Sequence, residues 1–253
     1  MKARIKFRKY GCLCFIGHLD VMRYFQKVMR RAQIPIAFTG GYSPHMIMSF
    51  AQPLGVGVTS DGEYLDIELT EPIPSGRAVR QMNEVMAEGI EIVSFSEIPE
   101  EKKYSGMTIT AAAEYEITLL ESGKCADRKK RIPESLVKSA EEFLAQDEIT
   151  VMKKTKRSEK EVDIKPMIYE MEVTDEAVRL FLATGSENNL KPDLVMEEFL
   201  KFAGEEPEHT PFHVHRLDVY AKKEGAADSG DAHVKDAGLV TLESLGREIT
   251  EER

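Results

Sequence analysis

The sequence predicts an α+β fold of two tandem split βαβ modules, residues 1–98 and 110–222, followed by an acidic, disordered tail at 223–253. Three observations support this prediction. Segments that alternate apolar and polar residues, as half-buried strands do, are interspersed with segments whose apolar residues recur every three or four positions, as in amphipathic helices. In the first module their order is strand, helix, strand, strand, helix, strand, which is the ferredoxin-like plan. A similar order recurs after residue 110, although the sequence itself is not repeated.

The first module begins with a strand that has one apolar and one cationic side. Residues 3–9 alternate apolar and basic side chains. Residues 18–33 have the apolar spacing of a helix, and bases near the end of this segment suit the negative end of a helix dipole. Gly40, Gly41 and Pro44 favour a loop. The remaining predicted elements are extended segments at 34–38, 45–51 and 55–59, a strand at 63–69, a helix at 76–87 and a strand at 90–97.

The second module follows a polar connection at 98–110. Its predicted elements are a strand at 112–120, a helix at 133–146, a strand at 148–154, a hairpin at 167–173 and 177–184, a helix at 191–203 and a strand at 211–221. From 224 to 253 the chain has eight acids and three bases, a composition typical of disorder. A short helix around 239–248 is the alternative for this tail.

Composition excludes several classes of protein. No stretch approaches the ~20 apolar residues that a membrane span needs. The basic start of the chain is not followed by an apolar block, so we expect no secretory signal. Cys12, Cys14 and Cys125 are too few for a disulfide framework. We therefore expect a cytoplasmic protein with reduced thiols that does not contact a membrane.

The net charge of −10 hides an asymmetry. Residues 1–50 contain nine Lys or Arg and one acid, Asp20, so this part carries +8 and the rest carries −18. A basic end on an acidic chain predicts a surface for an anionic partner. The alternative is that these charges only solubilise one strand and one helix.

The basic end contains the candidate anion- or RNA-binding residues. His18 stands at a helix N-terminus, where free N–H groups favour an anion. In the loop at 39–45, polar side chains can donate to phosphate and Tyr42 can stack on a base, although a plain Gly-Gly turn is the alternative. The predicted set is Arg4, Lys6, Arg8, His18, Arg23, Arg30, Tyr42, Ser43 and His45.

A second hypothesis is an enzyme whose pocket uses His18, Asp20, His45 and Glu63. A histidine between carboxylates can act as acid or base near neutral pH, but only if these four side chains converge. Asp20 can instead satisfy the helix dipole, and Glu63 can pair with the basic strand.

We expect neither a metal nor a cofactor. Cys12 and Cys14 do not have metal-ligand spacing, and the chain has no three-cysteine run for an iron–sulfur cluster. His213 and His215 share one face of a predicted strand with His209 nearby, but no carboxylate or cysteine at ligand spacing accompanies them.

Several runs resemble the radical SAM-linked protein family, a bacterial domain of unknown function. The clearest are Phe15–Arg23, Arg30–Pro35, Gly41–His45, Ser49–Gly57 and Glu63–Asp66; weaker ones are Val162–Lys165, Asn189–Pro192 and His215–Asp218. Before Pro44-His45 the family usually has Phe-Asn or Phe-Ser, where this chain has Tyr-Ser. The resemblance spans about 1–220. It implies a radical S-adenosylmethionine enzyme as partner and an association with RNA or ribosome modification, and it carries no established catalytic residues.

These observations together predict a non-catalytic accessory protein that binds RNA or presents a substrate to a radical SAM enzyme. The alternatives are the enzyme described above and a pure protein-interaction module with an apolar docking face. The RNA-binding prediction requires the cationic side chains of the first fifty residues and the segment 40–45 to lie together as one recess.

Overall fold

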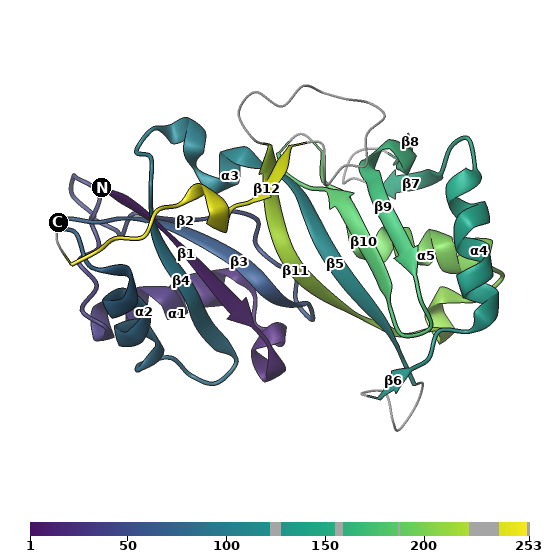
Figure 1. Ribbon diagram of the computed structural model, residues 1–253, viewed down its shortest axis with the longest axis horizontal. Coiled ribbons are helices and arrows are strands. Elements are labelled where there is room, and N and C mark those ends of the chain that lie inside the picture. Colours follow the sequence, from purple (N-terminus) through teal and green to yellow (C-terminus); the bar gives the residue numbers. More distant parts are fainter. Residues whose placement is uncertain (122–127, 155–158, 187, 223–237, 252–253) are drawn as a thin grey trace.

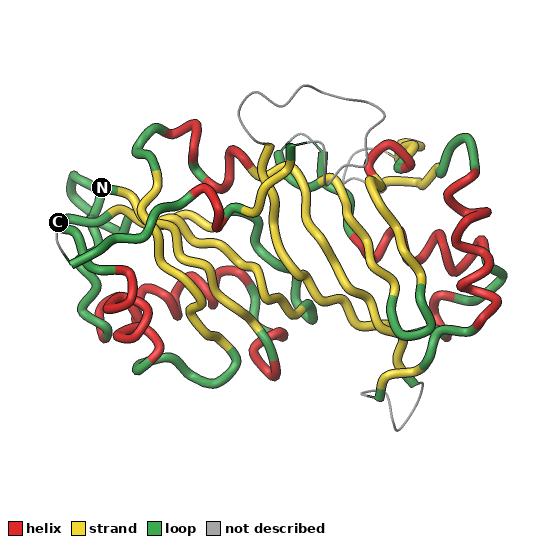
Figure 2. The backbone as a smooth tube through the Cα atoms, viewed as in Figure 1, coloured by secondary structure: helices red, strands yellow, loops and turns green. Residues whose placement is uncertain are grey.

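Strands from both halves of the chain join into one large mixed sheet, and a few helices cover it (Figures 1 and 2). The computed structural model describes residues 1–121, 128–154, 159–186, 188–222 and 238–251. The predicted α+β class is confirmed. In the described parts of the chain, no helix is both long and apolar enough to cross a membrane. Cys125 lies outside the described residues.

The helices lie within a few residues of the positions expected from apolar spacing. The exceptions are a short helix in the connection after residue 98 and the early end of the second helix, at Asn83. The bounds are α1 His18–Arg31, α2 Ser75–Asn83, α3 Gly106–Ile109, α4 Glu134–Ala145 and α5 Pro192–Phe202.

The strands of the main sheet follow the order β4-β1-β3-β11-β5-β10-β9, and β7 pairs with β8 in a separate hairpin. Apart from one junction, all neighbouring strands are antiparallel. The bounds are β1 Lys2–Lys9, β2 Met48–Phe50, β3 Thr59–Glu68, β4 Ile90–Ile98, β5 Thr110–Leu120, β6 Lys129–Lys130, β7 Thr150–Lys154, β8 Glu159–Asp163, β9 Ile168–Val173, β10 Val178–Ala183, β11 Phe212–Lys222 and β12 Leu239–Thr241.

The two halves meet where β3 runs parallel to β11. Only Thr59 and Ser60 pair there, with His215 and Arg216. The contact continues past Gly62, where an added Cβ would lie 2.7 Å from the Cα of Asp218. This close approach needs a residue without a side chain, because real Cβ atoms do not come so near to backbone. The junction makes the two halves one continuous sheet.

Alternation along β1 separates two chemically different faces. Ala3, Ile5 and Phe7 pack against α1 and α2 in an apolar core, whereas Arg4 and Lys6 point to the opposite face. In the view of Figure 1, α1 and α5 lie behind the sheet and the C-terminal segment crosses in front of it. The cationic side predicted for this strand therefore faces the C-terminal segment and not the helices.

The prediction of a disordered tail is wrong for residues 238–251. β12 pairs with the end of β11, and the side chain of Leu242 is fully buried. Arg247 exchanges two backbone hydrogen bonds with Glu97, and Ile249 enters the core beside α2. We call residues 238–251 the C-terminal strap. It is ordered because Leu242 and Ile249 reach the two cores and Glu243 pairs with Lys6, features that an average over the tail's composition does not reveal. The rest of the predicted tail, 223–237 and 252–253, lies outside the described residues.

The strap should make stability sensitive to acid through Glu243. Burial alone would raise the pKa of Glu243, but hydrogen bonds from Lys6 and Ser94 and the charge of Lys6 outweigh it and lower the pKa below the ordinary 4.5. A lowered carboxylate pKa contributes stability that is complete above the ordinary value and is lost as pH falls through the folded-state value. We expect Glu243→Gln to be less stable than wild type near pH 6 and to approach it near about pH 3, measured by urea unfolding. An equal gap at both pH values would contradict this.

Candidate functional site

The bases of β1 are largely engaged by the protein's own acids. Arg4, 2% exposed, donates to Asp66 over 2.7 Å and 3.0 Å, and Lys6 donates to Asp218 over 2.9 Å and Glu243 over 2.8 Å. The structure therefore places Arg4 and Lys6 in internal ion pairs, where neither is free to hold phosphate. Arg8 is half-exposed but also pairs, with Asp61 at 2.8 Å.

The bases of α1 and α2 are exposed instead. The apolar side of α1, including Phe25 and Met29, faces the sheet, so the basic positions three and four residues apart point outward. Asp20 is the single acid of the two helices, and it lies 3.4 Å from Arg23. We call the six exposed bases the helix face: Arg23, Lys27, Arg30, Arg31, Arg77 and Arg80.

The loop after α1 is exposed and hydrogen-bonded within itself. The Thr39 hydroxyl lies 3.1 Å from His45 Nδ1 and accepts the backbone N–H of His45, and Gly41 takes the positive φ that the turn requires. Ser43 is exposed, and Tyr42 is fully exposed. The single recess that we expected does not form, because the bases divide between two faces of the sheet and those of β1 are neutralised by acids.

Only two of the four proposed catalytic residues come together. His18 packs edge-on against Phe50, with ring centroids 5.0 Å apart, and shares a small pocket with Glu63. Asp20 is exposed and pairs with Arg23, and His45 belongs to the exposed loop. Neither lines the pocket, so the four side chains do not form one acid–base centre.

A buried charge cluster that sequence analysis missed lies beside His18. Lys9, Glu63 and Arg216 are each nine-tenths or more buried. Arg216 donates to the Glu63 carboxylate and, over 2.7 Å, to the backbone carbonyl of Gln52, while its Nε has no hydrogen-bond partner among the described residues. Burial lowers the pKa of Lys9, against the opposing effect of the Glu63 charge. One signal was present in the sequence: Lys9 follows Ile5 and Phe7 at alternate positions of the strand, so it is expected on the same, inward-facing side.

A cavity of about 330 Å³ adjoins this cluster. It lies between the loop at 52–58 and the N-terminal end of α5, and Arg216 of β11 lines it. Three of the runs quoted above, Ser49–Gly57, Asn189–Pro192 and His215–Asp218, supply most of its lining. We call it the junction cavity. Segments that are far apart in the sequence thus surround one space beside the β3–β11 contact.

Residues 2–192 match a bacterial protein family described as "Uncharacterized protein conserved in bacteria (DUF2344)". The chain belongs to this family. No curated protein matches the chain. The matched range includes α1, the loop at 52–58 and Glu63, whereas Arg216 and the strap of this DUF2344 protein lie beyond it.

A second polar network of the DUF2344 chain crosses the junction on the open face of the sheet. The Thr59 hydroxyl lies 2.7 Å from His213 Nε2 and 2.8 Å from His215 Nδ1, and His215 Nε2 lies 3.2 Å from Asp61. Burial would raise the pKa of Asp61, but hydrogen bonds from Arg8 and His215 lower it, so the carboxylate accepts from Nε2–H of His215. With His215 neutral, Thr59 then donates to Nδ1 and accepts from His213. The chain of donors and acceptors is complete and joins β3 to β11.

Removing the hydroxyl at the centre of this network should destabilise the junction. We expect Thr59→Val to lower the free energy of unfolding by about 1–3 kcal/mol, because both imidazoles lose a partner. Thr59→Ser, which keeps the hydroxyl, should stay near wild type. The check is the urea midpoint of both variants, and equal midpoints for Val and Ser would show that the network contributes nothing.

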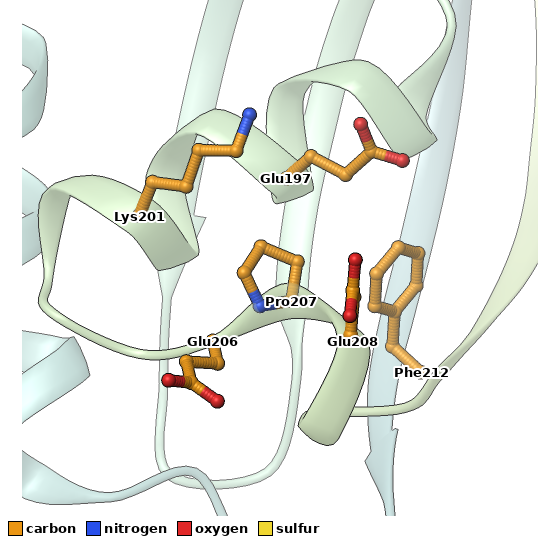
Figure 3. A pocket seen from close by; sticks show the side chains of 6 residues that line it. All are labelled: Glu197, Lys201, Glu206, Pro207, Glu208 and Phe212. Atoms are coloured by element: carbon orange, nitrogen blue, oxygen red, sulfur yellow. The ribbon is translucent and has the colours of Figure 1, made fainter.

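A larger hollow of about 620 Å³ in the DUF2344 protein has a different chemistry (Figure 3). Its lining includes Glu197, Glu206 and Glu208 beside Phe212, with Lys201 as the single base. His209 pairs with Glu206 near it and does not join the other two histidines of the predicted strand. None of the quoted runs lines this hollow. In the part of the chain that the structure describes, no three His, Cys, Asp or Glu side chains gather as a metal site.

Proposed function

We propose that this protein is a non-catalytic accessory protein that binds RNA through the helix face. One observation carries the proposal: α1 and α2 present six exposed bases and one acid, a net charge of +5, on a chain whose net charge is −10. A concentrated positive surface attracts a polyanion even where the protein as a whole is acidic. Phosphate contacts by Lys and Arg supply most of the affinity in such interfaces.

Exposed aromatic side chains in the following loop favour RNA over an acidic protein as partner. Tyr42 is fully exposed and Phe38 is 48% exposed, and both lie within fourteen residues of the end of α1. Single-stranded RNA binders combine a basic surface with aromatic rings on which unpaired bases stack. If RNA does not bind, the proposal fails and an acidic protein becomes the alternative partner.

The test compares binding of single-stranded RNA with salt concentration. We expect affinity to fall steeply with salt, and Arg23→Gln/Lys27→Gln/Arg30→Gln to reduce the logarithmic salt slope by about 2, at roughly 0.7 per lost phosphate contact. The matched control, Lys138→Gln/Arg179→Gln/Lys201→Gln, removes the same charge from exposed positions of the other half. Filter binding measures both. Salt-independent binding, or equal loss in the two variants, would overturn the proposal.

The proposed enzyme partner is a radical S-adenosylmethionine enzyme, and the resemblance of the quoted runs supports it. Co-purification of the two proteins tests this separately from RNA binding. Association that survives nuclease treatment and the helix-face substitutions would support a direct protein contact. Association that disappears with nuclease would mean that RNA bridges the two.

We also infer that each half is a split βαβ module with the boundaries 1–98 and 110–222. The antiparallel orders β4-β1-β3-β2 and β11-β5-β10-β9 support this inference, because each places its first and third strands in the centre. Such modules leave the face opposite the helices open for a partner or, in this chain, for the strap.

A further inference from the structure

We infer that the junction cavity binds a small organic anion, a compact apolar body that ends in a carboxylate or a phosphate. The inference goes beyond RNA binding by the helix face and does not depend on it. The volume of about 330 Å³ lies at the small end of the range for ligand sites, which suits a metabolite rather than a polymer.

Charge inside the protein favours an anion in this cavity. Lys9 and Arg216 are two buried bases, and among the described residues Glu63 is the single carboxylate that acts on them electrostatically. Arg216 lines this cavity, whereas Lys9 and Glu63 line the small neighbouring pocket beside His18. With Lys9 protonated, the cluster therefore keeps one uncompensated positive charge. A buried charge without a partner is costly, and a bound anion removes that cost.

Arg216 provides the specific hydrogen-bonding group. It lines the cavity, only 2% of it is exposed, and its Nε has no hydrogen-bond partner among the described residues, while Nη2 donates to both Glu63 and Gln52. Nε–H is therefore the donor left for a bound anion, and a guanidinium keeps its charge when buried, whereas a buried ammonium more readily loses its proton.

The other side of the cavity adds two features. The N-terminal end of α5 opens onto it, with Lys191 at the capping position, so a base and the positive end of the helix dipole lie at the rim. Asp193 in the first turn of α5 also lines the cavity, but it is exposed to solvent. Apolar groups complete the lining, among them Pro53, Leu54 and Val58, and these suit an apolar body.

The ligand test uses the full chain and three series of small probes. Butyrate, hexanoate and octanoate represent carboxylates, hexyl phosphate and nucleoside monophosphates represent phosphates, and hexanamide is the uncharged control. Isothermal titration calorimetry should give a dissociation constant below about 1 mM for at least one anion. Hexanamide should bind at least about tenfold more weakly than hexanoate. If no anion binds below about 1 mM, or if the amide binds as well as the acid, the inference fails.

Two sets of variants place the binding in this cavity. Arg216→Lys keeps the charge but loses the Nε–H donor, and we expect roughly tenfold weaker binding of the anion. Val56 lines the cavity and is 62% exposed, so both Val56→Glu and Val56→Gln should fold normally. Val56→Glu should weaken binding of the anion by charge repulsion, whereas Val56→Gln should leave the affinity unchanged. Equal affinities for Glu and Gln at this position would overturn the inference. The triple variant of the helix face should bind the anion as wild type does, so failure of either proposal is distinguishable from failure of the other.

Discussion

Replacing Arg4 with methionine is expected to lower the free energy of unfolding by about 3–5 kcal/mol. The substitution leaves the Asp66 carboxylate buried, 8% exposed, with the backbone N–H of Gly106 as a remaining donor at 2.7 Å. Arg4 also donates to the backbone carbonyls of Tyr104 and Leu242, which lose their donor as well. Urea unfolding monitored by circular dichroism measures the change.

A double variant shows how much of this loss comes from leaving the Asp66 carboxylate buried without its arginine partner. Arg4→Met/Asp66→Leu removes both partners, and it should recover most of the stability that the single variant loses, because no unpaired charge stays buried. The exposed pair Arg23–Asp20, with both side chains more than 60% exposed, is the control, and Arg23→Met should change stability by less than about 1 kcal/mol. Equal costs at the two arginines would show that the Arg4 pair is not buried in solution.

Ending the chain at residue 237 is expected to remove at least about 3–6 kcal/mol of stability, from the burial of two side chains alone. Leu242 is 0% exposed and Ile249 is 3% exposed, and the truncation exposes the core surfaces that both cover. It also removes Glu243 from Lys6 and the backbone pairing with Glu97 along β4. Thermal and urea unfolding of the truncated chain measure the loss.

Point variants separate the strap's packing from its length. Leu242→Ala should cost about 2–5 kcal/mol, as other leucine-to-alanine changes in cores do. Leu245→Ala lies on the same segment but is 37% exposed, and it should cost less than about 1 kcal/mol. A truncated chain as stable as wild type would mean that the strap does not pack on the sheet in solution.

Local sequence patterns predicted several elements of the fold. The alternation at 3–9 and 63–69 and the apolar spacing at 18–33 gave strands and a helix close to β1, β3 and α1, because these periods report which side of an element is buried. The concentration of bases in the first fifty residues was equally visible. It led to the exposed bases of α1, which the structure places on the helix face.

Local patterns did not predict which distant residues contact those elements. Lys6 meets Asp218 and Glu243, which are 212 and 237 positions away, and Arg216 meets Glu63, 153 positions away. Alternation predicts to which face of the sheet a side chain points, but it does not predict which distant segment of the chain packs on that face. The strand bases therefore looked like a binding surface until the order of the sheet and the path of the strap were known.

Local sequence patterns were enough to predict the α+β class, the positions of α1, α2, α4 and α5 and the basic character of the first fifty residues, since each depends on neighbours within one or two turns of chain. Tertiary structure alone decided that the final residues pack as a strap, that Lys9, Glu63 and Arg216 form one buried cluster, and that three distant runs surround the junction cavity. The physical reason is that burial and ion pairing depend on the summed packing of distant segments. A handful of apolar residues such as Leu242 and Ile249 can order a tail whose average composition resembles that of a disordered chain.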